Sequence, residues 1–356
     1  MDTTIPKYLL VEDHIRQQIK QRKITDRLPG ERVLAKELGY SYMTIRKAIE
    51  NLVAEGVLYK VPTKGTFVAN RKKSKSKTGT IGYFLDGRIA GGLSSPYYSM
   101  IFNALEKETT RKGYSLIYFS DNDPSNLRKI FKKMDGVIAS CFPRVEPLIQ
   151  EMKELVPIVA IDNSAADKTI PSVIIDNFSA MTVAVDHLCS LGHQRIGFMT
   201  GLEDSDVGKN RYAGYLSGLS KNGIDKDPEL VFRGNYTFRS GVSGVEYFLT
   251  LEQLPTAILC ANDSMALGAM NRLYQEDIKV PEEVSVIGFD DINISSQIVP
   301  PLTTIYVPVD EIAARAFGLL KNLIEGKGLD NRHVALAAKL VARDTTTEVA
   351  QEAEVS

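Results

Sequence analysis

The sequence predicts two folded parts: an N-terminal winged helix-turn-helix (α+β) domain and a larger α/β domain of two lobes. Two observations predict this division. Residues 1–77 hold 17 Lys and Arg against 8 Asp and Glu, whereas the remaining residues hold 26 against 36. From residue 80 onwards, apolar strand-like runs alternate with amphipathic helical segments, a pattern typical of parallel sheets covered by helices. A chain of 356 residues has the length for one small and one large domain.

The composition, 44% hydrophobic and 24% charged, is that of an ordinary globular protein. The N-terminus has neither a positive start nor an apolar core, so we expect no secretory signal. No apolar run reaches the ~18 residues that a membrane helix needs. Cys141, Cys189 and Cys260 are far apart and set among apolar residues, and the four histidines do not cluster with them. We therefore expect reduced thiols, no metal site and no cofactor.

Three helices are predicted in the N-terminal domain, at 8–22, 31–38 and 42–54, because apolar residues recur there at helical spacing. Gly39 ends the second helix, and Ser41 is a suitable N-cap for the third. This is the pattern of a helix-turn-helix. A strand at 57–61, a turn and a second strand at 66–69 follow directly, and a hairpin in that place is a wing.

The first turns of the third helix point away from its apolar face and are expected to enter a DNA major groove. Basic side chains and helix N-termini hold phosphates, and a glycine lets the wing tip approach DNA closely. The residues expected to contact DNA are Arg32, Tyr42, Thr44, Arg46, Lys47, Lys64 and Gly65. Each one alone fits a solvated surface position better, and the basic charge alone fits either reading. The complete set of helix, turn, helix and wing favours DNA.

Four segments then carry a resemblance: LPGERVLAKELG at 28–39, SYMTIRKAIENL at 41–52, EGVL at 55–58 and KGTFV at 64–68. Together they resemble the GntR-family winged helix. The resemblance implies that Arg32, Thr44, Arg46 and Gly65 contact DNA. The family commonly has Arg after the serine, where this chain has Tyr42, so the preferred operator sequence is left open.

The boundaries follow from composition. Residues 1–69 are assigned to the DNA-binding domain and 70–79 to a basic, flexible linker without apolar residues. The linker is either a passive tether or a segment that also touches DNA phosphates. Residues 80–345 are assigned to a ligand-binding and dimerisation domain, and 346–356 to a disordered tail.

The body contains two blocks of alternating strands and helices, near 80–162 and 172–290. The expected strands are 80–85, 115–119, 136–140, 157–161, 172–175, 195–200, 256–261 and 284–289. Helices are expected at 97–112, 179–191, 211–222 and 264–275, and a last stretch, 302–345, is expected to hold two strands around a helix at 309–324. Short polar side chains follow several strands, at the edge where ligands bind in open parallel sheets.

These polar residues are Asp86, Asp162, Asn262 and Asp290. They suit hydrogen bonds to the hydroxyl groups of a small polar ligand, an aromatic ring suits its apolar face, and Arg211 at the start of its helix offers a bidentate donor. Each Asp or Asn alone also fits a helix N-cap, and Asp263 and Asp291 are assigned to that role only.

Further motifs resemble the sensor domain of the LacI/GalR family, which is similar to periplasmic sugar-binding proteins. They are GHQRIG at 192–197, RYAGY at 211–215, PTAILCANDSMALG at 255–268, VPEEVSVIGFDD at 280–291, PLTT at 301–304 and LVARDT at 340–345. The resemblance implies a periplasmic-binding-protein-like body of two lobes joined by crossover strands, a sugar or similar ligand between them, and a dimer. It assigns effector binding to Asp162, Arg211, Asn262 and Asp290, stacking to Tyr98 and Tyr236, and a structural turn to His193.

The pairing of these two parts resembles the arabinose-repressor type of architecture, which does not fix the ligand. An enzyme is disfavoured because the chain has no dinucleotide fingerprint, phosphate loop or nucleophile elbow. An exported binding protein is disfavoured by the DNA-binding segments. We therefore expect a cytoplasmic bacterial regulator, most simply a repressor, that binds a double-stranded operator as a homodimer. We expect a small molecule bound between the lobes to change the affinity of the regulator for DNA.

Overall fold

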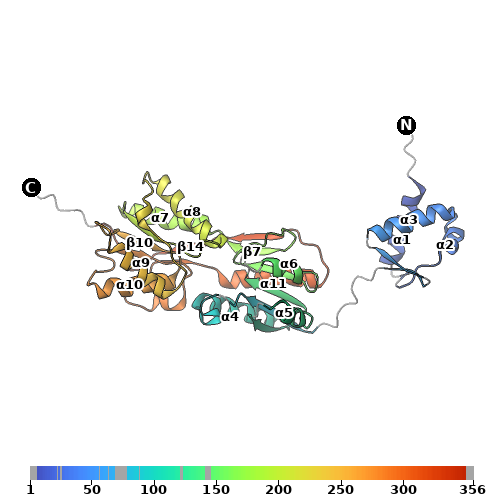
Figure 1. The fold of residues 1–356 in the computed structure, drawn as a ribbon, viewed down its shortest axis with the longest axis horizontal. Coiled ribbons are helices and arrows are strands. Elements are labelled where there is room, and N and C mark those ends of the chain that lie inside the picture. The colour runs from blue at the N-terminus through green and yellow to red at the C-terminus, as the bar shows by residue number, and fades with distance from the viewer. Residues whose placement is uncertain are drawn as a thin grey trace, which may run out of the picture. The chain divides into compact units, whose positions relative to one another are not determined.

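The computed structural model describes residues 6–21, 23–24, 26–55, 57–62, 64–68, 78–87, 89–120, 123–140 and 146–349. Its internal contacts divide the chain into two compact units, Met1–Lys77 and Thr78–Ser356 (Figure 1). We call them the head and the body. No helix of the described residues is long and apolar enough to cross a membrane.

The head is built from three helices and a two-stranded antiparallel hairpin: α1 (Lys7–Lys20), α2 (Glu31–Leu38), α3 (Tyr42–Ala54), β1 (Leu58–Val61) and β2 (Gly65–Val68). The three predicted helices and the wing are confirmed. Gly39 ends α2 in the left-handed conformation, with φ of +70°, and the Ser41 hydroxyl accepts the Thr44 N–H at 3.2 Å as the predicted N-cap. Ile45, Ile49 and other apolar residues of α3 are buried against α1 and α2.

The first lobe of the body contains a six-stranded parallel sheet in the order β13-β7-β6-β5-β3-β4. The strands are β3 (Thr80–Leu85), β4 (Ser115–Phe119), β5 (Gly136–Ser140), β6 (Ile158–Ile161), β7 (Ser172–Ile175) and β13 (His333–Leu336). Consecutive side chains of β3 point to opposite faces of the sheet. Tyr83 packs on the face covered by α4 (Pro96–Arg111) and α11 (Val309–Ile324). Phe84 packs on the face covered by α5 (Pro124–Phe131) and α6 (Glu146–Met152).

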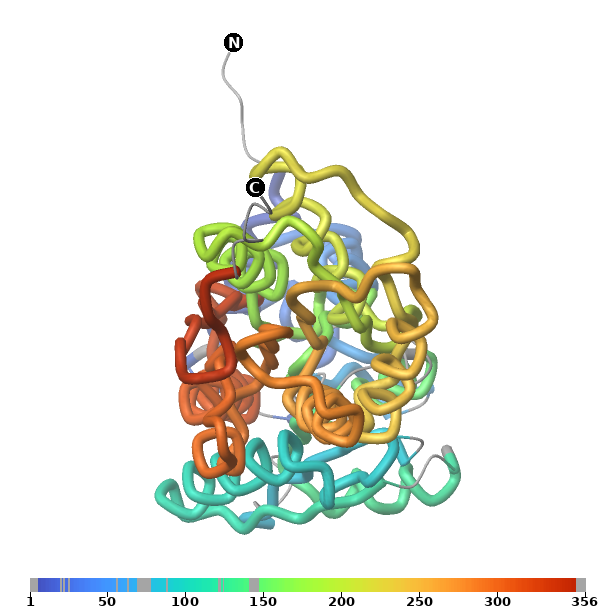
Figure 2. The backbone as a smooth tube through the Cα atoms, turned by 90° about the vertical axis from the view of Figure 1, so that its left-hand side faces the viewer, coloured from blue at the N-terminus to red at the C-terminus, as the bar shows by residue number. Residues whose placement is uncertain are grey.

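The second lobe contains a four-stranded parallel sheet in the order β11-β10-β8-β9. The strands are β8 (Ile196–Met199), β9 (Val231–Phe232), β10 (Ala257–Cys260) and β11 (Ser285–Ile287), and β12 (Thr304–Tyr306) pairs with β14 (Lys339–Val341) beside it. The helices are α7 (Asn177–Ser190), α8 (Asp206–Lys221), α9 (Phe238–Phe248) and α10 (Asp263–Gln275). Figure 1 shows α7 and α8 on one side of β10 and α9 and α10 on the other; Figure 2 gives the view from this lobe's end.

The strand expected to open the second block, β7, belongs instead to the first lobe. It pairs with β6 on one side and with β13 on the other, so residues 172–175 and 333–336 lie in one sheet. The chain therefore passes between the lobes three times, after β7, after β12 and after β13. Pairing partners this far apart in sequence leave no local signal, which is why the expected block boundary was wrong.

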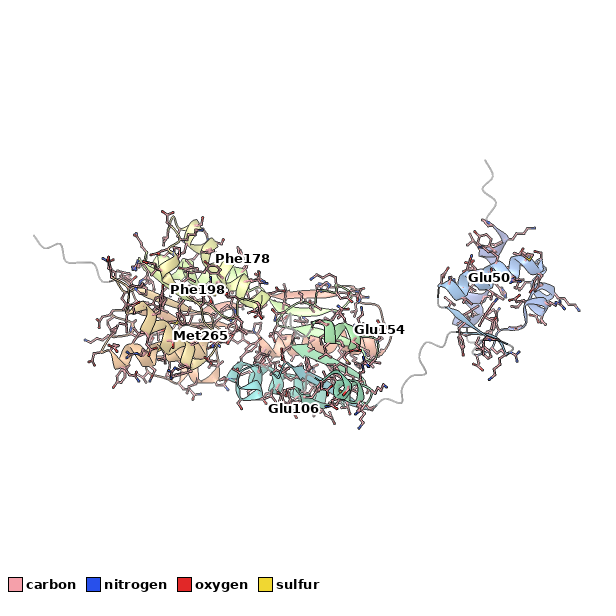
Figure 3. All side chains as sticks on the ribbon, viewed as in Figure 1. Glu50, Glu106, Glu154, Phe178, Phe198 and Met265 are labelled. Atoms are coloured by element: carbon pink, nitrogen blue, oxygen red, sulfur yellow. The ribbon has the colours of Figure 1, made fainter. Side chains whose placement is uncertain are left out.

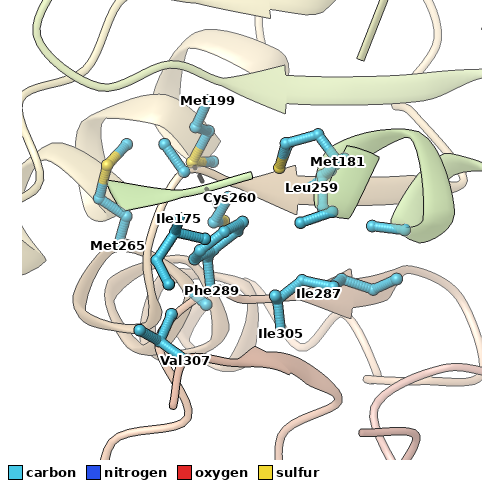
Figure 4. Packing of buried hydrophobic residues seen from close by; sticks show 14 of the residues in the cluster. Ile175, Met181, Met199, Leu259, Cys260, Met265, Ile287, Phe289, Ile305 and Val307 are labelled. Carbon is cyan, nitrogen blue, oxygen red and sulfur yellow. Dashed lines mark hydrogen bonds between the residues drawn. The ribbon is translucent and has the colours of Figure 1, made fainter. Parts of the chain in front are cut away.

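The lobes share a continuous apolar core where these crossings meet. Ile175 at the end of β7, Val307 after β12 and Phe289 after β11 lie close together (Figure 4), and all three are buried. Burial of this apolar surface stabilises the segments that cross between the lobes.

Two expected boundaries of the body are corrected. Asp135 accepts the N–H groups of Thr78 and Gly79, at 2.8 and 2.9 Å, so these two residues belong to the body and not to the linker. At the other end, the Thr347 N–H donates to Ser285 Oγ and the Val349 N–H to the Leu191 carbonyl, so residues 346–349 are part of the fold. Residues 70–77 of the expected linker and 350–356 of the expected tail lie outside the described residues.

Candidate ligand cavity and DNA-binding surface

A cavity of about 300 Å³ lies between the two lobes of the body. Its wall includes all seven residues that the sequence predicts for ligand binding: Asp86, Tyr98, Asp162, Arg211, Tyr236, Asn262 and Asp290. The first three come from the first lobe and the other four from the second. This volume is at the lower end of the range for small-molecule sites.

Three of these residues have a backbone conformation that side chains rarely adopt. The φ angles of Asp162, Tyr236 and Asp290 are +66°, +68° and +115°. Each residue comes one to four positions after the end of a strand. A left-handed backbone conformation there turns the chain, and the side chain lines the cavity. Such conformations cost about 1–3 kcal/mol each and are concentrated at binding sites.

Arg211 makes several polar contacts on the wall. Its Nε donates to Asn177 Oδ1 at 2.8 Å, one terminal nitrogen donates to the Ala261 carbonyl, and the other lies 3.7 Å from Asp290 Oδ1. The guanidinium also lies over the Phe289 ring. The predicted helix start was wrong: α8 begins at Asp206, with Ser205 as its N-cap, so Arg211 lies in the second turn and faces inward.

The carboxylates of the wall are held in different ways. The Tyr97 hydroxyl donates to Asp162 Oδ1 at 2.7 Å, while Asp162 Oδ2 has no hydrogen-bond partner among the described residues. Burial raises the pKa of Asp162, and the bond from Tyr97, the nearby Ser140 hydroxyl and the charge of Arg211 only partly oppose this. Burial likewise raises the pKa of Asp290 well above its ordinary value despite the nearby Arg211.

Asn262 is both a helix cap and part of the wall. Its Oδ1 accepts the Met265 N–H at 2.9 Å at the start of α10, and its Nδ2 donates to the Tyr236 carbonyl at 3.0 Å. The capping role and the cavity position therefore coexist. The Tyr236 hydroxyl lies near Ser205 but makes no bond of acceptable geometry, and burial raises its pKa.

The capping role expected for Asp263 and Asp291 is wrong. Asp263 is the first residue of α10, fully buried, and accepts bonds from Ser295 Oγ, the Ile292 N–H and Thr304 Oγ1. Asp291 accepts from Arg343 at 2.7 Å. Both brace the segment after β11, a tertiary role that position in the sequence does not reveal.

Sequence reasoning missed several wall residues. Tyr97 and Ser205 are side chains at helix starts, and Asn177 orients Arg211. A signal existed for Tyr97, which stands beside the predicted Tyr98. No signal existed for Asn163, which does not line the cavity: its Oδ1 accepts the Val207 N–H at 3.1 Å and so joins the two lobes directly.

On the head, six of the seven residues predicted to contact DNA are exposed, and Thr44 is half-buried with its hydroxyl 2.8 Å from Ser41 Oγ. Tyr42 and Met43 are 41% and 67% exposed, whereas Ile45 beside them is buried, so the outward face of α3 is as predicted. Arg46 pairs with Glu50 one turn along at 3.0 Å; Glu50 is labelled in Figure 3. This pair holds the Arg46 side chain along the helix.

The wing tip depends on a residue that sequence reasoning missed. Gly65 has φ of +113°, and a Cβ added there would lie 3.2 Å from Arg27 Nε. The segment containing Arg27 is joined to the wing, because Leu28 N–H donates to the Thr66 carbonyl and Val68 N–H to the Asp26 carbonyl. A basic residue just before the Leu-Pro-Gly break was the available signal.

Among the described residues, no histidine or cysteine lines the cavity or belongs to the predicted DNA contacts. His193 is buried, with its ring nitrogens 3.0 Å from Thr256 Oγ1 and 3.1 Å from Ser285 Oγ, and burial lowers its pKa. Cys189 and Cys260 are free thiols, and Cys141 lies outside the described residues. Among the described residues no group of three His, Cys, Asp or Glu side chains is placed to hold a metal ion.

Comparison with known proteins agrees with both parts. The model of the gntR family of bacterial regulatory proteins matches residues 7–68, and that of the periplasmic binding protein-like domain matches residues 185–346. The repressor CytR of Escherichia coli (strain K12) is 33% identical over 286 residues, which are 78% of this chain and 81% of CytR.

Solved structures agree as well. A LacI-family regulatory protein from Chloroflexus aggregans matches with a TM-score of 0.66 and 27% identity, covering 76% of this chain and 99% of that one. A sugar-binding transcriptional regulator of the LacI family from Escherichia coli, complexed with phosphate, matches with a TM-score of 0.63 and 29% identity, covering 76% and 99%.

A helix-turn-helix head and a two-lobed body with an interlobe cavity define a transcription regulator that binds DNA and responds to a small-molecule effector. The chain belongs to the LacI family of bacterial transcription repressors, and its head is of the gntR type.

Proposed function

We propose that this repressor binds a two-fold operator as a homodimer. We further propose that a sugar or similar polar molecule in the interlobe cavity controls its affinity for the operator. The observation that carries the proposal is the cavity itself, where side chains from both lobes present hydrogen-bonding groups beside three tyrosine rings. A ligand touching both lobes binds one arrangement of the lobes more tightly than others and so shifts their equilibrium. Relief of repression by the ligand is the preferred direction.

The proposed DNA contacts are Arg32, Tyr42, Thr44, Arg46, Lys47, Lys64 and Gly65, with Arg27 added at the wing. The start of α3 supplies the major-groove contacts, and the basic side chains hold phosphates. Because phosphate contacts release counterions, operator affinity is expected to fall steeply as salt rises. A protein that acts on DNA in this way works in the bacterial cytoplasm.

The homodimer is supported by an exposed apolar segment of the body. Ile294 and Val299 are 43% and 93% exposed, five residues apart. Contiguous exposed apolar surface marks association sites, and we propose that a two-fold dimer buries these two side chains on both copies. Val299→Asp is expected to raise the dimer dissociation constant at least tenfold in analytical ultracentrifugation. An unchanged constant contradicts the use of this segment.

The proposed ligand contacts are Asp86, Tyr98, Asp162, Arg211, Tyr236, Asn262 and Asp290. We propose binding without turnover, since the relatives are regulators and the described residues of the wall include no Cys, His or Lys.

The test is a thermal-shift screen of sugars and nucleosides on the full chain, followed by operator binding with each hit. A ligand at 100 times its Kd stabilises the folded body by about 2.7 kcal/mol. Asp290→Ala is expected to abolish the ligand response and to leave operator affinity unchanged. A hit that shifts the melting temperature but not operator affinity contradicts effector control, and chemical conversion of the hit contradicts binding without turnover.

A further inference from the structure

A hydrogen bond joins the two lobes outside the segments that cross between them. Asn163 follows β6 in the first lobe, and its Oδ1 accepts the Val207 N–H of α8 in the second lobe at 3.1 Å. Asn163 is 2% exposed and does not line the cavity. Buried polar atoms are rarely left without a partner, and here the partner belongs to the other lobe. The bond is therefore made only while the lobes are in contact at this point.

A strained turn sets the direction of the Asn163 side chain. The Asn163 N–H donates to the Ile161 carbonyl at 2.8 Å, two residues back, and Asp162 between them has φ of +66°. A bond of this span around a residue with positive φ is a γ-turn of the rarer, strained kind. The turn presents Asp162 to the cavity and Asn163 to α8. One short segment therefore contributes both to the wall and to the contact between the lobes.

The donor lies in the first turn of the helix that carries Arg211. The first N–H groups of a helix have no partner inside it. Ser205, the N-cap of α8, accepts the Gly208 N–H at 3.0 Å from within the second lobe, whereas Asn163 accepts the Val207 N–H from the first lobe. Val207 and Arg211 are four residues apart, so they share one side of α8, and both line the cavity. The contact with the first lobe is thus made one turn away from the guanidinium.

We propose that Asn163 is a positioning residue that holds the lobes together over the cavity, and that its bond to Val207 sets the share of molecules in this arrangement before effector binds. The inference rests on the proposed function, since it places the effector between the lobes. One hydrogen bond changes such an equilibrium about two- to tenfold. An effector binds only those molecules whose lobes are arranged to contact it, so its apparent Kd rises as their share falls. Asn163 thus controls sensitivity to the effector without lining the cavity.

The first experiment measures the lobes directly, on the full-length chain without effector. The native cysteines are replaced by alanine, and spin labels are attached at Lys107→Cys in α4 and Lys226→Cys after α8, both exposed positions and one in each lobe. Double electron–electron resonance then gives the distance between the labels. Adding Asn163→Ala is expected to produce a second population of distances. Distributions that coincide with and without Asn163→Ala overturn the inference and leave the proposed function standing.

Amide hydrogen exchange shows whether the variant acts at the bond itself. In Asn163→Ala the Val207 amide is expected to exchange faster, because its acceptor is gone. The Gly208 amide keeps its Ser205 partner and should keep its protection. Faster exchange at both amides means that the start of α8 has lost its structure, and overturns the assignment. Unchanged exchange at Val207 overturns it as well.

The second experiment measures sensitivity to the effector. Ribose, glucose, adenosine and cytidine are titrated by calorimetry into the native chain and into Asn163→Ala. For each molecule that the native chain binds, the Kd is expected to rise about two- to tenfold. An unchanged Kd overturns the role of Asn163 in sensitivity. Binding of none of the four counts against the proposed function, and the distances between the lobes then decide the inference by themselves.

Two further variants separate the bond from general stability. Asp123→Ala removes a helix cap within the first lobe, where Asp123 Oδ1 accepts the Ser125 N–H at 2.8 Å at the start of α5. It should lower the melting temperature and change neither the distance between the lobes nor the Kd. Asn163→Asp keeps an acceptor for the Val207 N–H, at a helix N-terminus that favours a carboxylate, and should keep the native distances. If Asp123→Ala also separates the lobes, or if Asn163→Asp separates them as Asn163→Ala does, the bond is not what holds them and the inference fails.

Discussion

The guanidinium carbon of Arg211 lies 3.5 Å from the centroid of the Phe289 ring. This contact joins a hydrogen-bonded cation of the cavity wall to the apolar core at the crossings between the lobes. A cation over an aromatic face gains most where water is excluded, as it is here. The position of Arg211 is therefore fixed by the Phe289 ring against one face of the guanidinium and by the hydrogen bonds of its nitrogens.

Phe289→Leu is expected to remove that support. The free energy of unfolding of the body should fall by about 1–3 kcal/mol, because a buried ring is replaced by a smaller side chain. Ligand affinity should fall as well, because the Arg211 guanidinium loses the aromatic ring against which it packs. Denaturant unfolding and ligand titration measure the two effects separately.

The matched control is Phe198→Leu. Phe198 is also fully buried in the second lobe, stacked on Tyr215 with ring centroids 4.8 Å apart, and does not line the cavity. It should lose comparable stability with no loss of ligand affinity. Equal loss of ligand affinity in both variants would mean that it comes from general destabilisation of the second lobe and not from loss of the contact between Phe289 and Arg211.

Arg46→Ala is expected to weaken operator binding by about 1–3 kcal/mol, the range for a good contact between a side chain and a base. Ligand affinity should not change, because the head and the body are separate units. Gel-shift and calorimetric titrations on the same preparation test this. Arg128→Ala, which removes an exposed arginine of the body, is the control for net charge. Loss of both activities in Arg46→Ala contradicts separate roles.

Gly65→Ala is expected to damage the wing. An alanine at φ of +113° is strained, and its Cβ would press on the Arg27 side chain at 3.2 Å. We expect operator affinity to fall at least tenfold while the melting temperature of the body is unchanged. Gly30→Ala is the control in the same domain, since φ there is −59° and no atom lies within 4 Å of the added Cβ. Equal effects of the two variants would argue against a specific role of the wing tip.

Asp263 gives a pH dependence to the stability of the body. Burial raises its pKa from 3.8 to about 6, although Thr304, Ser295 and the Ile292 N–H donate to it. Between these two values the folded state keeps a proton that the unfolded state has lost. The contribution of Asp263 to the free energy of unfolding therefore falls by about 3 kcal/mol as pH rises from about 4 to about 6, and is constant above that range.

The measurement is denaturant unfolding from pH 4 to 8 for the native chain and for Asp263→Asn, which does not ionise. The difference between their unfolding free energies should change across pH 4 to 6 and be flat above it. Parallel curves across the whole range mean that Asp263 has an ordinary pKa in the fold.

Local pattern was sufficient where one segment decides its own structure. The helices of the head follow from apolar spacing, with Gly39 and Ser41 marking a stop and a start, and both are seen to act in that way. The strands of the body follow from continuous apolar runs. The polar residues beyond strand ends were predicted to gather because the carboxyl ends of parallel strands meet at one edge, and all of them line the cavity.

By itself, the sequence determined that a basic helix-turn-helix head and a two-lobed sensor share one chain, because periodicity, caps and charge are local properties. Only the tertiary structure decided that β7 joins the first lobe, that Arg211 faces inward from the second turn of α8, and that Asp263 braces a distant segment. The physical reason is the same in each case. Strand pairing, burial and hydrogen bonds between residues far apart in the chain depend on which surfaces meet, and that is settled only when the whole core has closed.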